Sequence, residues 1–313
     1  MDIFNGRNAN PMLIAEIQEP FDSSDFIYEL KLDGERCLAY LDKNGTALLN
    51  KRGFILNNRF PELADIHKAI KDKCILDGEI AILVDSKPDF SQVQRRSLMT
   101  NKFKIDMEIN KHPACFTAFD ILYLGGKQIT DLPLMERKKL LKKVIRAEND
   151  RFAMSRYIEG QGKALYEAAE KQELEGVVAK RKDSPYLMGK RTKDWVKFKR
   201  LFDDDFVVLG YIEKANNVVS IILGQYNDTT IKYKGHVTLG VSREDFGIIS
   251  HMPEIDNPFP AEKGNEDACW ILPELVCAVQ WMPRKNGALN QPVYKGLRDD
   301  KAPEDCKISA ERA

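Results

Sequence analysis

The sequence has no excess of charge of either sign and few residues spaced to bind zinc. Its 48 Lys and Arg residues balance 48 Asp and Glu residues, so any surface for nucleic acid must be local. The four histidines are scattered, and the six cysteines contain no C-x-x-C pair. These spacings argue against a zinc site, and such cysteines are typical of free thiols in a reducing, cytoplasmic environment.

Long apolar runs are missing as well. The first seven residues hold no apolar signal core and no later run is long enough to cross a membrane, so we expect no membrane association. Of the 313 residues, 43% are hydrophobic and 31% are charged. This length and composition predict two soluble domains with packed cores.

The stretch Lys31–Arg36 (KLDGER) places a lysine among carboxylates. Residues 26–32 have strand composition, and strand alternation puts Glu29, Lys31 and Asp33 on the polar face. A solvated strand face that ends in an Asp-Gly turn would explain this pattern. The alternative is a nucleophilic lysine, which must lose its proton. Lowering its pKa from about 10.4 to about 7 takes roughly 4–5 kcal/mol. One cation about 4 Å away supplies about 4 kcal/mol at an effective dielectric near 20. The nucleophile hypothesis therefore requires cations from elsewhere in the chain.

Short strands and helices are predicted up to about residue 200. Residues 37–42 and 46–50 flank an Asp-Lys-Asn-Gly turn and indicate a hairpin. Further strands are predicted at 74–84, 116–123 and 195–199, and helices at 61–73, 134–146 and 161–173, with 91–112 first helical and then irregular.

Two of these segments carry informative alternation. In 74–84, Asp77 and Glu79 fall on one face, although Asp77-Gly78 is equally compatible with a hairpin turn. In 116–123, Phe119, Ile121 and Tyr123 fall on one face, as core residues usually do.

Positive charge is concentrated between Lys180 and Arg200, where nine Lys and Arg residues face two Asp residues. Runs of charge are usually solvated faces. Here, however, strand alternation places Trp195, Lys197 and Lys199 together, which favours a functional role for these lysines.

The pattern changes after Asp203-Asp204-Asp205, which marks a domain boundary. Strands are predicted at 206–212, 218–226, 230–240, 274–282 and 289–296, with a helix near 243–251. Five strands with an interposed helix are compatible with an OB-fold, and almost equally with another small barrel.

Taken in order, the motifs resemble those of the covalent nucleotidyltransferases, the superfamily of ATP-dependent DNA ligases and mRNA capping enzymes. The match runs from Pro11 to Lys301. Its parts are K-x-D-G-x-R at Lys31–Arg36, D-G-E at Asp77–Glu79, F-D-I-L-Y at Phe119–Tyr123, E-G-V-x-x-K at Glu175–Lys180, W-x-K-x-K at Trp195–Lys199 and R-x-D-K at Arg298–Lys301.

The resemblance is closest to the ligase domain of bacterial end-joining ligases. Capping enzymes tend to have D-G-L-I-F where this chain has E-G-V-V from Glu175. The ligase motif S-R-x-G reads Asn50-Lys51-Arg52-Gly53 here, so either Lys51 or Arg52 takes the place of the phosphate-binding arginine. We expect no N-terminal DNA-binding domain, because only thirty residues precede Lys31. We also expect no polymerase, nuclease, zinc or helix-hairpin-helix module, which implies ATP rather than NAD as cofactor.

The resemblance implies a role for each matched residue in the first chemical step. Lys31 would attack the α-phosphate of ATP, which Lys197 and Lys199 would hold while also lowering the Lys31 pKa. Arg298 and Lys301 would orient the pyrophosphate. A hinge motion about residues 200–205 would then free the second domain to grip DNA.

The remaining matched residues would bind the nucleotide and a metal ion. Glu29 would lie near the adenine amine, and Phe119 would stack on the ring. Arg36 would reach the ribose or the nick phosphate. Glu79 and Glu175 would serve the ribose and Mg²⁺, or Mn²⁺ in its place.

The implied fold is α+β: an adenylation (nucleotidyltransferase) domain of antiparallel sheets and helices at 1–201, then an OB-fold β-barrel at 202–313. The implied function is an ATP-dependent DNA ligase that seals nicks in double-stranded DNA through a lysyl-AMP and a DNA-adenylate. We expect a monomer, with a DNA-end-binding or repair protein as partner. An RNA ligase or a guanylyltransferase of the same superfamily, and a non-catalytic DNA-binding relic, are the alternatives.

Overall fold

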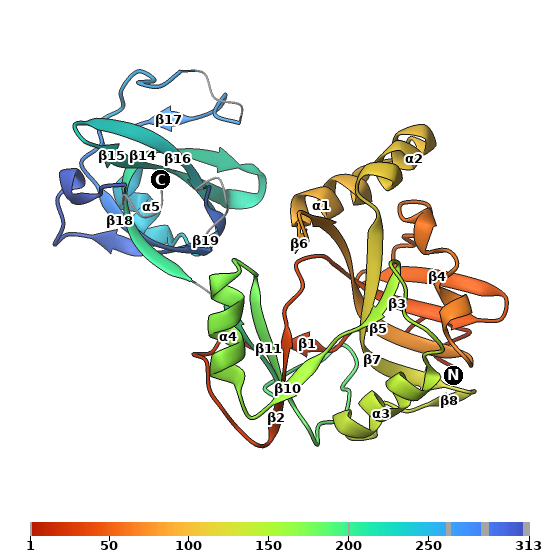
Figure 1. Cartoon of the computed structure of the whole chain (residues 1–313). Coiled ribbons are helices and arrows are strands. Elements are labelled where there is room, and N and C mark those ends of the chain that lie inside the picture. Colours follow the sequence, from red (N-terminus) through yellow and green to blue (C-terminus); the bar gives the residue numbers. More distant parts are fainter. Residues whose placement is uncertain (1, 200, 261–263, 283–287, 309–313) are drawn as a thin grey trace. The chain divides into compact units, whose positions relative to one another are not determined.

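The computed structural model describes residues 2–199, 201–260, 264–282 and 288–308. The chain divides into two compact units, Met1–Lys199 and Arg200–Ala313 (Figure 1). Among the described residues, no helix has both the length and the apolar character needed to span a membrane.

The larger sheet of the first unit has the order β4-β3-β5-β7-β8, with β6 on β5 and β9 on β7. Its strands are β3 (Glu35–Asp42), β4 (Gly45–Asn50), β5 (Cys74–Val84), β6 (Lys87–Pro88), β7 (Ala114–Leu124), β8 (Lys127–Gln128) and β9 (Phe152–Met154). The predicted hairpin at 37–50 is confirmed as β3 and β4. Apolar side chains from these strands, among them Leu76 and Phe116, form the main core.

The smaller sheet is antiparallel, with the order β10-β2-β11-β13. Its strands are β10 (Tyr157–Glu159), β2 (Phe26–Leu30), β11 (Gly176–Arg181) and β13 (Trp195–Lys199), and a short parallel pair joins β1 (Leu13–Ile14) to β12 (Arg191–Thr192). Helix α4 (Gly162–Lys171) covers one face, where Tyr28, Val177 and Phe198 are buried (Figure 1). The opposite face carries the alternate residues of β2 and β13, including Glu29 and Lys197.

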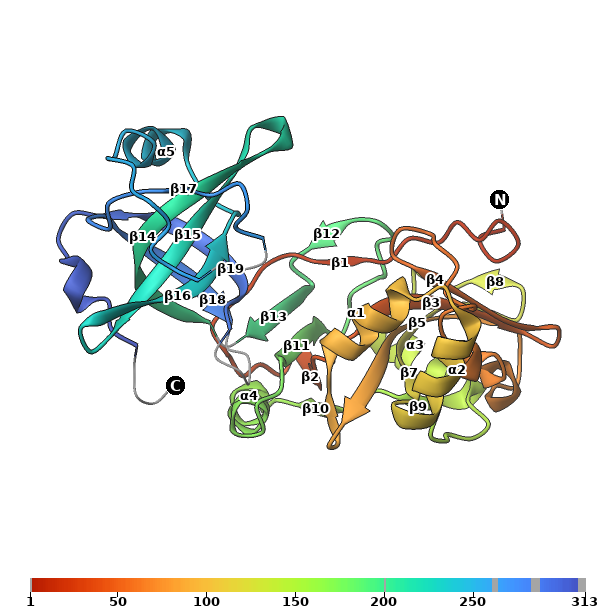
Figure 2. The ribbon, with the colours of Figure 1, turned by 90° about the horizontal axis from the view of Figure 1, so that it is seen from above.

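The other helices of the first unit differ in part from the predictions. Helix α3 (Leu134–Val144) and α4 match them, but 91–112 forms two helices, α1 (Phe90–Leu98) and α2 (Lys102–Lys111). Side chains of Asp89 and Asn101 cap these two helices, and α1 packs on β3 and β5 (Figure 2).

The helix predicted at 61–73 is wrong. The segment forms two 3-10 turns, η1 (Pro61–Leu63) and η2 (Ile66–Ala69), and Ile70 is already extended. Backbone bonds to the end of α3 and to the residues that follow it explain the difference: Arg146 N donates to Ala69 O, and Lys71 N to Val144 O. The apolar periodicity was real, since Leu63, Ile66 and Ile70 lie in the main core, but tertiary pairing ended the helix.

Two β-bulges also correct the predicted alternation. Residues Asp77 and Gly78 lie inside the continuous strand β5, so the hairpin alternative is wrong. The pairing of β5 with β7 shifts at Ile75/Leu76 and again at Asp77/Gly78. As a result Phe119 packs in a different cluster from Ile121, although alternation predicted a shared face.

The second unit is a barrel-like sheet of order β16-β15-β14-β18-β19, with β17 on β14. Its elements are β14 (Phe202–Lys214), η3 (Ala215–Asn217), β15 (Val218–Asn227), β16 (Thr230–Val237), α5 (Arg243–Ile249), β17 (Cys269–Trp270), β18 (Val276–Met282), β19 (Asn290–Arg298) and η4 (Pro303–Asp305). A parallel bridge from Leu239 to Val293 links the segment after β16 to β19 and closes the sheet. The Asp203–Asp205 triplet lies inside β14 rather than in a linker. Arg200, in the predicted hinge, is outside the described residues.

Candidate active site

Lys31 and Lys199 share one carboxylate. Lys31 directly follows β2, and its Nζ donates to Glu175 Oε2 at 2.7 Å. Lys199 Nζ lies 2.5 Å from Glu175 Oε1. The Glu175 side chain is 9% exposed, so both ion pairs are largely shielded from solvent. Residues of two motifs, Lys31 and Lys199, are therefore both in direct contact with Glu175 of a third motif.

Strand register explains why these residues meet. Glu29, Val178 and Lys197 are aligned across β2, β11 and β13. In the next row, Lys31 N donates to Gly176 O at 2.9 Å, and Gly176 pairs with Lys199. Rows two residues apart lie on the same face of a sheet. Hence all the lysines of the two motifs project from the face opposite α4.

Glycine is required at two of these motif positions. Gly176 has φ of +139°, and a Cβ there would be 2.0 Å from the Phe198 carbonyl oxygen. At Gly34, a Cβ would be 2.2 Å from the Ile80 carbonyl oxygen and 2.9 Å from Glu79 Cγ. The absence of a side chain at Gly34 therefore lets the loop after Lys31 lie directly against β5 and Glu79.

The charge balance at Lys31 differs from the prediction. Burial lowers the Lys31 pKa, but Glu175, Glu79 and Asp33 raise it more, so the net pKa is raised. Lys197 has a lowered pKa because it is partly buried and repelled by Lys199 and Lys31. Cations do lie near Lys31, as the nucleophile hypothesis requires, but the carboxylates outweigh them. In this arrangement Lys31 is a protonated ammonium.

Glu79 lies opposite Arg36 in the β3–β5 pairing and is partly buried. Burial raises its pKa to about 8, with Glu175 and Asp77 adding to the effect and Lys31 and Arg36 opposing it. Two neighbouring carboxylates, Glu79 and Glu175, offer the oxygen ligands that a hard divalent cation prefers. Among the described residues no cluster of three or more His, Cys, Asp or Glu could hold a metal. Such an ion would therefore need further oxygens from phosphate and water.

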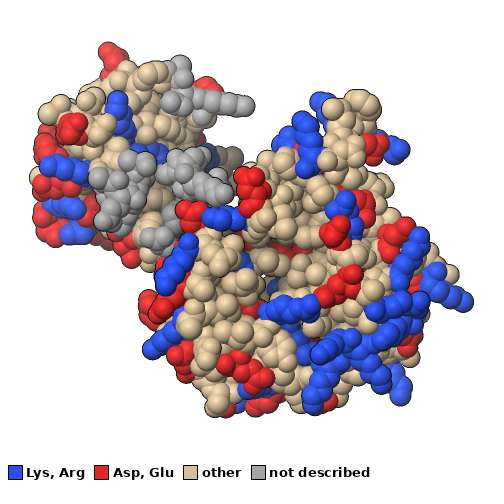
Figure 3. Space-filling model, in the orientation of Figure 1, with Lys and Arg blue, Asp and Glu red and all other residues tan. Residues whose placement is uncertain are grey.

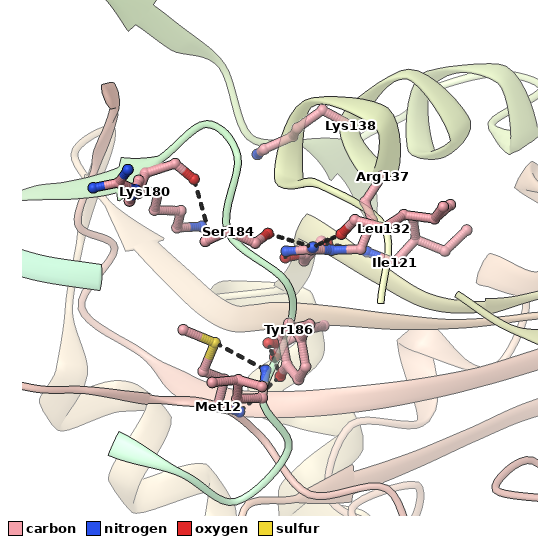
Figure 4. Close-up of polar contacts among 12 residues, drawn as sticks. Met12, Ile121, Leu132, Arg137, Lys138, Lys180, Ser184 and Tyr186 are labelled. Carbon is pink, nitrogen blue, oxygen red and sulfur yellow. Dashed lines mark hydrogen bonds and ion pairs between the residues drawn. The ribbon is translucent and has the colours of Figure 1, made fainter. Parts of the chain in front are cut away.

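Arg36 is held by Asp77, a residue for which the motifs predicted no role. Nε and Nη2 of Arg36 donate to the two Asp77 oxygens at 3.1 and 2.7 Å. The Tyr186 hydroxyl donates to Asp77 at 2.6 Å and accepts from the Met12 backbone (Figure 4). The guanidinium carbon also lies 5.4 Å from the Phe119 ring centroid. Arg36 and Phe119 are therefore neighbours, as the nucleotide-site prediction requires.

Glu29 is buried, whereas alternation predicted a solvated polar face. Its carboxylate accepts from Lys138 of α3, from Lys180 at 3.1 Å and from Ser155 at 2.9 Å. Lys180 Nζ lies 4.2 Å from the Phe119 centroid, and burial lowers the Lys180 pKa to about 8. Lys180 thus joins Glu29 to Phe119. No local sequence signal pointed to Lys138, because nothing in the sequence distinguishes it from the other lysines of this basic helix.

A second buried ion pair joins α3 to β7. Arg137 Nε and Nη2 donate to Asp120 at 2.8 and 2.9 Å, and both side chains are fully buried. Nη1 donates to the Leu132 and Ser184 carbonyl oxygens at 2.5 and 2.9 Å (Figure 4). Arg137 therefore fixes α3 to β7 and to the loop that carries Tyr186.

Two predicted residues of the first unit lie outside this cluster, and two others belong to the second unit. Lys51 and Arg52 are exposed in the turn after β4, where the Asn50 side chain accepts from the Arg52 and Phe54 backbones at 3.0 Å. Arg298 and Lys301 belong to the second unit and contact Asp205 there.

Comparison with known families shows the family of the chain. The family model "ATP dependent DNA ligase domain" matches residues 9–199, and "ATP dependent DNA ligase C terminal region" matches residues 214–301. The chain belongs to the ATP-dependent DNA ligase family. The predicted resemblance to this family is confirmed, and so is the α+β fold of a nucleotidyltransferase-type domain followed by an OB-fold region.

Individual relatives agree with this assignment. The chain is 32% identical to the SPbeta prophage-derived DNA ligase-like protein LigB of Bacillus subtilis, covering 92% of this chain and 98% of LigB. It is 29% identical to the multifunctional non-homologous end joining DNA repair protein LigD of Mycobacterium tuberculosis, covering 97% of this chain but 40% of LigD. The chain thus spans about two fifths of the mycobacterial LigD relatives. A solved structure of mycobacterial DNA ligase D with ATP and MES has 27% identity, covers 96% of this chain and 99% of that chain, and gives a TM-score of 0.57.

The basic segment before the second unit is less exposed than its composition suggests. Lys180 and Lys199 are buried in the site, and Lys182 is paired with Glu159. Basic side chains also gather over the side of the first unit that carries α3 and β8 (Figure 3), where α3 exposes Lys139, Lys142 and Lys143. Exposed cations that could meet DNA phosphates are thus divided between separate segments.

Proposed function

We propose that the protein is an ATP-dependent DNA ligase that seals 5′-phosphate/3′-hydroxyl nicks in double-stranded DNA. The observation that carries this proposal is the Glu175 carboxylate, which contacts Lys31 and Lys199 at 2.7 and 2.5 Å within a ligase-family domain. In this proposal residues 1–201 form the adenylation domain, and residues 202–313 form the OB-fold domain that helps to bind DNA.

The first step is an in-line displacement at phosphorus. Lys31 Nζ forms a bond to the α-phosphorus of ATP, and the bond to the bridging oxygen breaks as pyrophosphate leaves. Glu175 keeps Lys31 oriented and protonated, so this ion pair must loosen and the amine must lose its proton before attack. Lys197 and Lys199 would then balance the charge on the α-phosphate.

Glu79 and Glu175 are the proposed ligands of Mg²⁺, or of Mn²⁺ in its place. When bound, this ion would supply charge neutralisation at the phosphates. The support is the chemistry of the two side chains, since both supply carboxylate oxygens, the ligands that these ions prefer.

The base and ribose contacts are also proposed from the motifs and their neighbours. Glu29 would accept a hydrogen bond from the adenine amine, because its two lysine partners favour the ionised carboxylate. Phe119 would stack on the base and Arg36 would contact the ribose or the nick phosphate. Lys51 or Arg52 would contact phosphate.

In the later steps AMP passes from Lys31 to the 5′-phosphate of a nick, and the 3′-hydroxyl then displaces AMP. Arg298 and Lys301 are proposed to contact the pyrophosphate and so to serve the first step only. We further propose that the protein acts as a monomer in the cytoplasm beside a DNA-end-binding or repair partner. The name of the LigD relative, which refers to end joining, supports such a partner.

The decisive experiment compares four substrate combinations: nicked DNA or nicked RNA, each with ATP or GTP. A DNA ligase should seal nicked DNA with ATP and fail in the other three. The same assays are run on Lys31→Ala, which removes the proposed nucleophile. Lys193→Ala is its matched control, because the Lys193 side chain is 81% exposed. Sealing of RNA, or transfer of GMP, would instead support one of the rival enzymes of the superfamily. The absence of any nucleotide transfer would favour a DNA-binding relic.

A further inference from the structure

Asp205, in strand β14, bonds to both cations of the R-x-D-K motif. Its Oδ2 accepts from Lys301 Nζ at 2.6 Å, and its Oδ1 accepts from Arg298 Nη1 at 3.3 Å. The Asp205 side chain is 15% exposed, against 38% for Arg298 and 30% for Lys301. Asp300 also accepts from Arg298, at 2.6 and 2.7 Å, but its side chain is 61% exposed. Asp205 is therefore the sheltered carboxylate of this cluster, and the one that contacts both cations.

The strand register shows why Asp205 can reach them. Asp205 pairs with Ala278 of β18, and Ala278 pairs with Gly296 of β19. Arg298 lies two residues beyond Gly296, on the same face of the sheet. Because the two intervening positions are small, the space between the Asp205 carboxylate and the Arg298 side chain is not filled by a bulky residue. From the sequence alone, Asp205 was predicted only to mark a domain boundary.

We propose that Asp205 is a positioning residue for the first step, which holds Arg298 and Lys301 in one orientation for the pyrophosphate. This rests on the proposed function. Long basic side chains have many rotamers, and two neighbouring cations repel each other. One shared carboxylate restricts the rotamers and offsets the repulsion before ATP binds. It also leaves further donor hydrogens on each cation for phosphate oxygens. The later steps involve no pyrophosphate, so the effect should be confined to self-adenylation and its reversal.

The test uses the whole chain and the isosteric variant Asp205→Asn. Its matched control is Asp203→Asn, because Asp203 lies on the same face of β14 but contacts Gln280 instead. The expected result is a roughly ten- to hundredfold slower self-adenylation with ATP, the range expected when positioning is lost. Pyrophosphate-driven loss of AMP should slow equally, while sealing of a pre-adenylated nick stays unchanged. Asp203→Asn should match the wild-type protein in all three assays.

Two further variants separate positioning from a purely structural role. Asp205→Glu keeps the charge and should recover most of the lost rate. Adding Asp205→Asn to the double variant Arg298→Ala/Lys301→Ala should cause no further loss of self-adenylation, since the residues it acts through are gone. The proposal is overturned if Asp205→Asn adenylates as fast as Asp203→Asn, if it adenylates faster than wild type, or if pre-adenylated sealing falls in parallel. Failure of the wild-type protein to form any adenylate would overturn the proposed function instead.

Discussion

Gly34 is the position where one added methyl group should most affect the first step. In Gly34→Ala the new Cβ would stand 2.2 Å from the Ile80 carbonyl oxygen, with Glu79 Cγ at 2.9 Å. One of these contacts is with backbone, so a side-chain rotation cannot relieve it. Since non-bonded carbon and oxygen atoms need more than 3 Å, the loop after Lys31 or strand β5 must move by about 1 Å. A displacement of that size at a reacting group can lower a rate about 10²-fold.

The assay is single-turnover self-adenylation, followed by intact mass at saturating ATP. We expect Gly34→Ala to be about 10²-fold slower and to lose about 1–3 kcal/mol of unfolding free energy through overpacking. Gly247→Ala is the control, because a Cβ at this position of α5 would meet no atom within 4 Å. If Gly34→Ala adenylates itself at the wild-type rate at saturating ATP, close contact between the loop and β5 is not what positions Lys31.

The remaining predictions concern charge. Lys31→Ala should form no AMP adduct by intact mass, and Lys31→Arg should not restore it because a guanidinium stays protonated; an adduct in either variant would contradict the assignment. The carboxylates around Lys31 raise its pKa and attack needs the neutral amine. Below that pKa, self-adenylation should therefore rise up to about tenfold per pH unit, and a rate that falls as pH rises would oppose this. Asp120→Ala leaves Arg137 buried without a counter-charge, so denaturant unfolding should show a loss of about 3–5 kcal/mol; an unchanged midpoint would contradict the buried pair. Nick sealing should fall when salt rises from about 50 to 200 mM, because binding of Lys and Arg to DNA phosphates releases counterions and is weakened by salt, while self-adenylation should change little; a parallel decline would argue against this.

Much of the fold follows from local signals. The Asn44-Gly45 turn and the alternation on either side of it identify β3 and β4, and the W-x-K-x-K alternation identifies β13 with its lysines on one face. The failures have tertiary causes. Residues 61–73 have helical periodicity, but the backbones of Ala69 and Lys71 form hydrogen bonds with the end of α3 and the residues after it, and the helix cannot continue. The bulges of β5 against β7 separate Phe119 from Ile121, and a bulge has no signal in simple alternation.

The partners of the central contacts all lie in motifs that the sequence reveals. Lys31, Glu175 and Lys199 belong to three motifs, and the register of β2, β11 and β13 places them in contact. The residues that hold the motif side chains were not predictable in the same way. Lys138 and Asp205 lie 109 and 93 residues from their partners Glu29 and Arg298. Only packing of separate elements brings such pairs together.

The central claim is that Lys31 carries AMP. Its most direct test is the intact mass of the protein after incubation with ATP and Mg²⁺, followed by peptide mapping of the modified residue. We predict a gain of one AMP on Lys31, retained in Lys193→Ala and absent from Lys31→Ala. No gain in mass, or an adduct mapped to any other residue, would contradict it.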